Sequence, residues 1–131
     1  YLEEMRKLCV NKDLVFASRY LKGGGSDDDT FLTIVGNKIF SFIGNFFFKL
    51  NLSDILYTYV LGRTSSAKKL FLKYHDFRIC VEIPILAKFY NYQYISLPSI
   101  ERKRIGGKKK VNEFKDGFLI LTAMINLFFK K

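Results

Sequence analysis

Residues that bind metals or form disulfides are scarce in this sequence, which has only two cysteines and one histidine in 131 residues. Cys9 and Cys80 are too few for a disulfide framework, and their apolar neighbours are typical of reduced, buried thiols. His75 has no cysteine or carboxylate at metal-ligand spacing and no identifiable nucleophile beside it. We therefore expect a histidine at a surface or turn rather than a catalytic one.

Acidic residues and long apolar runs are also limited. Lys and Arg outnumber Asp and Glu by 22 to 12, and the formal charge of +10 favours a polyanionic partner: nucleotide phosphates, lipid phosphates or nucleic acid. Polar residues interrupt each apolar run before it could span a bilayer, and no signal peptide is visible. A hydrophobic content of 49%, with 14 Phe, excludes a disordered chain, and the length fits one domain with one core.

Helix-type and strand-type patterns alternate along the chain, which predicts an α/β fold. We expect helices over residues 2–10, 31–50, 65–74 and from 112 onward, and strands over residues 14–17, 55–61 and 93–97. Asp76 should cap a further segment that runs to residue 91. Because Pro84 removes one helical hydrogen bond, the regular helix in that segment is expected to begin near Glu82.

Residues 31–50 carry the strongest helical pattern. Apolar residues at helical spacing form one stripe: Leu32, Val35, Ile39, Phe42, Phe46 and Leu50. A narrow polar strip repeats every four residues: Asn37, Ser41, Asn45 and Lys49. A helix this apolar belongs to the core or lies against lipid, and we favour a core helix with part of it near a membrane. The Asp27-Asp28-Asp29 run before it favours an N-cap at Asp29 or Thr30 over a metal site.

The last predicted helix, after Asn112 as its cap, is amphipathic. One face carries Phe114, Phe118, Leu121, Ile125 and Phe128. Its apolar part is too short to span a membrane, so an interfacial helix and a helix packed against the domain are both open. We divide the chain into an α/β part, residues 1–111, and this C-terminal helix, residues 112–131.

Residues 101–110 are the most basic stretch, Glu101-Arg-Lys-Arg-Ile-Gly-Gly-Lys-Lys-Lys. Gly106 and Gly107 allow a bend between the cations, and ordered elements are expected on both sides, which favours a phosphate-binding loop over a solvated charge run. Glu82 is a lone acid in an apolar neighbourhood and needs a partner, which the basic loop would supply.

Four segments share a pattern with one enzyme family. They are Asp13-Leu-Val-Phe-Ala-Ser-Arg-Tyr-Leu-Lys-Gly-Gly, Leu52-Ser-Asp-Ile-Leu-Tyr-Thr-Tyr-Val-Leu-Gly, Phe77-Arg-Ile-Cys-Val-Glu-Ile-Pro-Ile and the basic loop. In this order they resemble the Ser-Arg-Tyr strand with its Gly-rich loop, the Ser-Asp-x-x-(Ser/Thr)-Gly-Phe segment, the Phe-x-x-x-x-Glu helix and the Arg-x-x-Gly-x-Ser-Lys loop of family 2 glycosyltransferases. The branch that transfers sugars to dolichyl or polyprenyl phosphate is the most similar, and the resemblance covers nearly the whole chain.

The resemblance implies the C-terminal portion of a GT-A fold, a Rossmann-like nucleotide-sugar transferase domain. It implies sugar transfer from a nucleotide-sugar donor to a lipid phosphate, with inversion. Asp54 and Glu82 would be catalytic, Asp54 near the sugar and Glu82 by organising the basic loop. Substrate or phosphate contacts would come from Arg19, Lys38, Arg104, Gly107, Lys109 and Lys110. A phosphate acceptor is already anionic, so positioning and charge neutralisation matter more than a strong base.

The resemblance places the nucleotide motif and the Asp-x-Asp metal motif upstream of Tyr1. A Mg²⁺ or Mn²⁺ ion is therefore expected for the full-length enzyme, with its ligands outside this chain. The enzyme would be cytoplasmic and peripheral to the cytoplasmic face of a membrane. Thr33 stands where the family has Arg, Lys109 where it has Ser and Tyr59-Val60 where it has Gly-Phe, so the acceptor is left open.

Two other functions are open: a basic nucleic-acid-binding module and a non-enzymatic membrane-surface module. Nucleic acid is a less favoured partner, because the cations concentrate in one Gly-bearing loop and the aromatic residues lie mostly on helix faces.

We predict that the 131-residue chain alone neither binds a divalent metal as the full enzyme would nor turns over a nucleotide-sugar, because the motifs for both would lie upstream. Incubation with labelled nucleotide-sugars and a prenyl phosphate checks this. Measurable sugar transfer by the chain alone would refute it.

Overall fold

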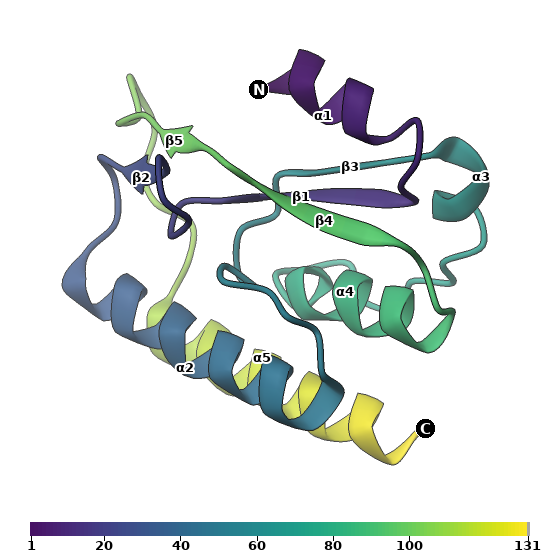
Figure 1. The fold of residues 1–131 in the computed structure, drawn as a ribbon. Helices are drawn as coiled ribbons and strands as arrows, with labels where there is room; N and C mark the ends of the chain where they lie inside the picture. The colour runs from purple at the N-terminus through teal and green to yellow at the C-terminus, as the bar shows by residue number, and fades with distance from the viewer. Residues whose placement is uncertain (131) are drawn as a thin grey trace.

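The computed structural model describes residues 1–130, which form a mixed α/β domain with two small sheets and five helices (Figure 1). The helices are α1 Leu2–Leu8, α2 Phe31–Phe48, α3 Thr64–Ala67, α4 Ile79–Phe89 and α5 Glu113–Phe129. The strands are β1 Leu14–Ser18, β2 Gly25–Ser26, β3 Val60–Gly62, β4 Tyr94–Pro98 and β5 Ile100–Glu101. The expected α/β class is confirmed.

β1 is the centre of the larger sheet, whose strand order is β3-β1-β4. It pairs parallel with β4, with Phe16 opposite Ser96, and antiparallel with β3, with Phe16 opposite Val60. All five residues of β1 are buried, as its uninterrupted apolar run predicts. β2 and β5 form a short parallel pair beyond the ends of β1 and β4 (Figure 1).

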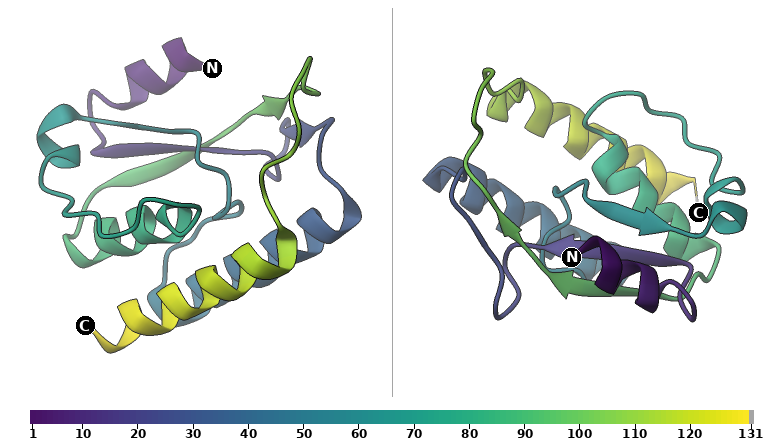
Figure 2. Two further views of the ribbon diagram at one scale, coloured as in Figure 1. Left: turned by 180° about the vertical axis from the view of Figure 1, so that it is seen from behind. Right: turned by 90° about the horizontal axis from the view of Figure 1, so that it is seen from above.

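Helices cover both faces of this sheet, which explains why β1 is apolar throughout. Val15 and Ala17 pack with Met5 of α1 on one face. Leu14 and Phe16 point to the other face, because side chains alternate along a strand, and join the core formed with α2, α4 and α5. α2 and α5 lie side by side and run in the same direction (Figure 2).

Several predicted elements are confirmed. The helix near the N-terminus, the strands over residues 14–17 and 93–97, the long helix and the last helix are present. Thr30 caps α2 by accepting a hydrogen bond from the Thr33 amide, and Asn112 caps α5 in the same way from Lys115. α5 packs through Ile120, Ala123, Met124 and Leu127, while its Phe114 and Phe118 are exposed.

Three predicted boundaries are wrong, two of them because side chains take the backbone hydrogen bonds. Ser41 and Asn37 accept from the amides of Ile55 and Leu56, so only Val60–Gly62 remains for the strand predicted over residues 55–61. Glu82 accepts from the amides of Lys73 and Tyr74, so the helix predicted to reach residue 74 ends at Ala67.

The third wrong boundary concerns α4. It begins at Ile79 rather than near Glu82, and Pro84 lies inside it and is buried. The helix accommodates Pro84 near its start, where the loss is a single hydrogen bond.

The inward face of α2 differs from the expected one. Two members of its polar strip, Asn37 and Ser41, are buried with Gly44 and Phe48, whereas Asn45 and Lys49 are exposed. Four members of the apolar stripe that was expected in the core face outward: Leu32, Ile39, Phe42 and Phe46, the last two being 66% and 65% exposed. Leu50, just beyond the end of α2, is buried. The reason is the hydrogen-bonding demand of residues 52–56, which the polar strip meets.

This orientation gives a stability prediction. Ser41→Ala leaves the buried Ile55 amide without its acceptor and should lower the free energy of unfolding by about 1–3 kcal/mol. Phe46→Ala, which removes an exposed side chain, should cost less than about 1 kcal/mol. Urea unfolding followed by circular dichroism measures both, and the reverse order would mean that the apolar stripe faces the core.

Candidate functional site

Arg19 follows β1 directly and is the centre of a buried ion cluster. Its Nε and Nη2 atoms donate to the two carboxylate oxygens of Asp54, at 2.8 and 2.9 Å. Its Nη1 atom donates to Asp29 at 2.9 Å and to Glu101 at 3.0 Å. The side chain is 7% exposed and lies over the Tyr57 ring, 4.5 Å from its centre. Four segments that are distant in the sequence therefore meet at one guanidinium.

The cluster keeps Arg19 charged. Burial by itself lowers the pKa of the Arg19 guanidinium, but the hydrogen bonds and negative charges of Asp54, Glu101 and Asp29 outweigh it and raise the net pKa. Tyr20 donates its hydroxyl to Asp29, and burial together with this bond raises the pKa of Tyr20. Three carboxylates already neutralise Arg19, so its charge is not free for a ligand.

A pocket of about 230 Å³ opens beside this cluster, against the first turns of α2 and α5. Its lining includes the cations Arg19, Arg104 and Lys109 and the acids Asp28, Asp29, Glu101 and Asp116. Leu56, Tyr57, Phe77 and Ile120 supply its apolar part. The pocket thus joins charged groups from the basic loop to apolar side chains of the core.

The basic loop reaches the pocket through Arg104 and Lys109. Arg104 Nε lies 3.1 Å from an Asp28 carboxylate oxygen. Lys109 Nζ donates to Thr33 Oγ1 at 2.8 Å and to Glu113 at 2.7 Å. A phosphate group entering the pocket could draw on both cations, and it would compete with Asp28 for Arg104.

Sequence reasoning missed the role of the acidic run at residues 27–29. All three members pair with cations: Asp27 with Arg102, Asp28 with Arg104 and Asp29 with Arg19. The cap of α2 is Thr30, one of the two residues predicted for that role. The complementary charges of the two runs were the available signal, and β2–β5 pairing brings the runs together.

A shallow groove of about 110 Å³ continues from the pocket between α2 and α5. Leu32, Gly36, Phe40, Phe114 and Gly117 line it. It shares further residues with the pocket: Thr33, Leu56, Val111, Asp116 and Ile120. A mostly apolar path, whose lining also includes Glu113 and Asp116, therefore connects the charged pocket to the outer side of the two helices.

Of the residues predicted for the site, Arg19, Arg104 and Lys109 line the pocket, and Asp54 stands behind Arg19. Lys38 is exposed on α2. Gly107 and Lys110 are exposed in the loop, and Gly107 has a φ of +85°, a conformation that favours glycine.

The expected pairing of Glu82 with the basic loop is wrong. Its carboxylate is 1% exposed and accepts from the backbone amides of Lys73 at 2.7 Å and Tyr74 at 3.0 Å. Backbone amides satisfy a buried carboxylate as well as a cation does. Glu82 therefore holds residues 73 and 74 against α4.

The other chemistry-bearing residues offer little to the pocket. Burial raises the pKa of the Cys80 thiol to about 12, so this pocket residue is a neutral thiol. His75 is exposed in the irregular segment before α4, as expected.

Within residues 1–130, no group of three or more His, Cys, Asp or Glu could hold a metal ion. The pocket acids Asp28, Asp29 and Glu101 bind arginines, and Asp116 accepts from the Asn112 amide. The metal implied by the resemblance does not fit these residues.

No protein-family model matches the chain, and no curated protein matches it either. The resemblance to family 2 glycosyltransferases therefore rests on the four quoted segments and stays a proposal.

The Arg19 cluster gives a second stability prediction. Arg19→Lys cannot reproduce the forked contacts and leaves the buried Asp54 without its bidentate partner, so it should lower the free energy of unfolding by about 3–5 kcal/mol. Arg102→Lys, at a side chain that is 80% exposed, should change it by less than about 0.5 kcal/mol. Thermal unfolding measures both, and equal stability of the two variants would contradict a central role for Arg19.

Proposed function

We propose that this chain is part of a GT-A glycosyltransferase that transfers a sugar from a nucleotide-sugar donor to a dolichyl or polyprenyl phosphate, with inversion. The observation that carries the proposal is the convergence at Arg19. Three of the four resembling segments meet there: the end of β1, the segment containing Asp54, and the start of the basic loop. A coincidental match of short motifs would give no reason for these segments to share one pocket.

The residues take the following roles in this proposal. Arg104 and Lys109 neutralise phosphate in the pocket, and Lys108 and Lys110 add to the positive potential of the loop. Arg19 and Asp54 act as positioning residues, because the hydrogen-bond donors of Arg19 are occupied by carboxylates. This revises the expectation that Arg19 contacts the acceptor phosphate directly.

The groove between α2 and α5 supports a lipid-linked acceptor. A molecule with a phosphate head and an apolar chain matches a charged pocket that continues into an apolar groove. The phosphate oxygen that attacks the sugar is already ionised at neutral pH, so the pocket needs cations and correct placement more than a base. The donor and any Mg²⁺ or Mn²⁺ would be bound largely by residues outside this chain.

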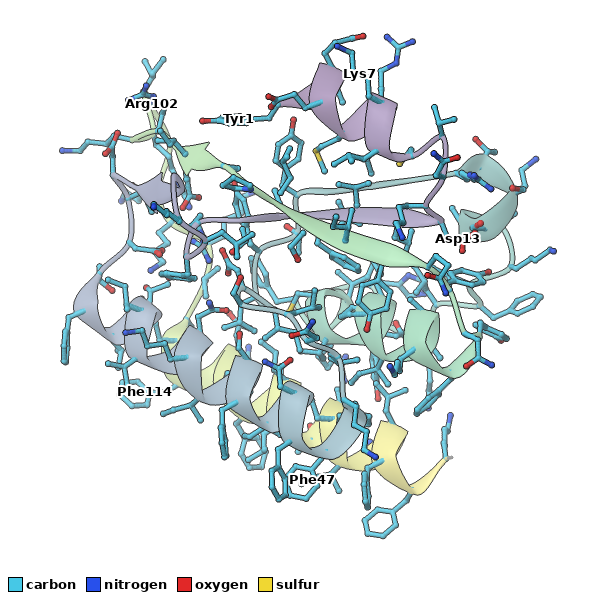
Figure 3. All side chains as sticks on the ribbon, viewed as in Figure 1. Tyr1, Lys7, Asp13, Phe47, Arg102 and Phe114 are labelled. Atoms are coloured by element: carbon cyan, nitrogen blue, oxygen red, sulfur yellow. The ribbon has the colours of Figure 1, made fainter. Side chains whose placement is uncertain are left out.

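A nucleic-acid-binding module is supported less well. Arg102, Arg104 and Lys109 are paired with acids. The exposed Phe42, Phe46 and Phe47 lie in the second half of α2, away from the basic loop, and the labelled Phe47 is on the opposite side of the molecule from Arg102 (Figure 3). Stacking and phosphate contacts would therefore not share one surface.

Binding of a short-chain prenyl phosphate to the chain tests the pocket. Arg104→Ala should weaken binding about tenfold or more, because a charge-assisted hydrogen bond is lost. Asp28→Asn should strengthen binding, because it releases Arg104 from its competing partner. Arg102→Ala, outside the pocket lining, is the matched control and should change affinity less than about threefold. Calorimetry or phosphorus NMR supplies the dissociation constants.

Equal losses of affinity in Arg102→Ala and Arg104→Ala would show that the pocket is not the phosphate-binding site. Equal affinity for the corresponding prenyl alcohol would exclude a phosphate-dependent site. In the full-length enzyme, an Arg104→Ala variant that still folds should lose sugar transfer to prenyl phosphate. Unchanged transfer would contradict the transferase proposal.

A further inference from the structure

β4 is an edge strand of the larger sheet. It pairs with β1 alone among the described strands, and the right-hand view of Figure 2 shows it along the margin of the sheet. An edge strand leaves one row of backbone N–H and C=O groups unpaired, and such a row is a template for the addition of another strand. β4 is therefore a place where a further chain could extend the sheet.

The unpaired groups of this edge belong to Tyr94 and Ser96. The Asp13 amide donates to the Gln93 carbonyl at 2.7 Å, so the carbonyl of Gln93 points toward β1. Successive residues of a strand direct their N–H and C=O groups to opposite sides within the sheet. The N–H and C=O groups of Tyr94 and Ser96 therefore point outward, and none of them has a hydrogen-bond partner within residues 1–130.

A groove beside these groups leaves space for a partner strand. It has a volume of about 460 Å³ and is lined by residues 94–96 together with Leu21, Asn45 and residues 51–53. The side chain of Ile95 is 39% exposed at this edge. Pro98 is the next outward-facing residue and has no N–H, so the donors of the edge end at Ser96. The edge thus suits a short pairing.

The edge is complementary to itself. A twofold axis at Ile95 places Tyr94 of one copy opposite Ser96 of the other, in antiparallel register. Each such pair exchanges two N–H···O=C bonds, so the two pairs make four. Ile95 then faces its own counterpart in the closer, non-hydrogen-bonded position, with Cα atoms about 4.5 Å apart. All the free groups of Tyr94 and Ser96 find partners in an identical edge, as an isologous dimer requires.

Charge also favours a second copy at this edge. Residues 93–98 contain no charged side chain, although Lys and Arg make up 22 of the 131 residues. Edge strands that avoid pairing commonly carry Lys or another charge, and β4 lacks this protection. Since the net charge is +10, two copies repel each other over most of their surface, and contact costs least at a neutral edge. An acidic peptide, by contrast, would find no cation on this strand.

We propose that two copies of this chain associate through β4, in antiparallel register centred on Ile95, and so join their three-stranded sheets into one. No residue of β4 lines the charged pocket, so this proposal is independent of the transferase function.

Sedimentation velocity over a range of concentrations tests the interface. The wild-type chain should dimerise with a micromolar-range dissociation constant. Ile95→Lys should raise that constant at least about tenfold, because it replaces the central apolar contact with two opposed cations. Ser96→Pro removes an outward N–H but leaves the ladder with β1 intact. It should raise the constant about thirtyfold, because two of the four bonds are lost.

Val10→Lys is the matched control for Ile95→Lys. It makes the same change in charge at a side chain that is 69% exposed, in a turn bound by Arg63 on the β3 side of the sheet. The dissociation constant should be that of the wild type. Circular dichroism establishes that each variant is folded, and if Ser96→Pro does not fold, Ile95→Lys still tests the edge.

Disulfide trapping tests the register, in a Cys9→Ser background with Cys80 left in place because it is buried. Ile95→Cys should form a covalent dimer under mild oxidation, because the twofold axis brings the two Cβ atoms into disulfide range. Gln93→Cys is the control on the same strand. The same register separates the two copies of residue 93 by about 13 Å, which is too far for a disulfide.

Three results would overturn the proposal. The first is a folded wild-type chain that stays monomeric at millimolar concentration. The second is a dimer that survives both Ile95→Lys and Ser96→Pro, or that is abolished by Phe42→Ser/Phe46→Ser on the exposed side of α2, since either places the interface elsewhere. The third is trapping of Gln93→Cys without trapping of Ile95→Cys. None of these measurements uses a sugar donor or acceptor, so their failure leaves the transferase proposal standing.

Discussion

The buried guanidinium of Arg19 holds the functional end of this domain together. It binds Asp54, Asp29 and Glu101, and so joins the end of β1 to the segment before β3, the N-terminal approach to α2 and the start of the basic loop. Desolvating one cation and three carboxylates is costly, and only near-complete hydrogen bonding makes such a cluster tolerable. The segments that it joins line much of the pocket, and α4 and α5 supply further lining residues. The pocket therefore has a rigid floor of paired charges and a rim of exposed cations.

The pairing of these charges limits what the net positive charge of the chain can bind. The most buried arginine near the pocket is neutralised, and the loop cations Arg102, Arg104 and Lys109 each have an acidic partner. An anionic ligand must therefore exchange for a carboxylate rather than fill an empty positive site. Such exchange favours ligands with more charge or better geometry than a carboxylate, which a phosphate provides.

The sequence predicts the elements whose patterns have only one physical solution. The apolar run of β1, the caps Thr30 and Asn112 and the exposed basic loop are of this kind. The orientation of α2 could not be predicted, because a Phe-rich stripe normally marks the core and the hydrogen-bonding needs of Ile55 and Leu56 are not visible in their own residue types. The predicted partner of Glu82 was wrong for a related reason. Its partners are the backbone amides of Lys73 and Tyr74, which carry no sequence signal. Of the candidate site, the sequence predicted the pocket residues Arg19, Arg104 and Lys109 but not the competition of Asp28 for Arg104.

The parallel course of α2 and α5 has an electrostatic consequence. Lys109 bridges Thr33 in the first turn of α2 and Glu113 in the first turn of α5, and Phe47 meets Phe128 at the other end, so both helices begin at the pocket. The aligned peptide dipoles of a helix leave partial positive charge at its N-terminus. Two such ends add their potentials at the pocket, while Lys49 and Lys130 stand at the negative C-terminal ends. An anion that displaces a carboxylate between the helices would therefore be attracted by both helix ends as well as by the loop cations.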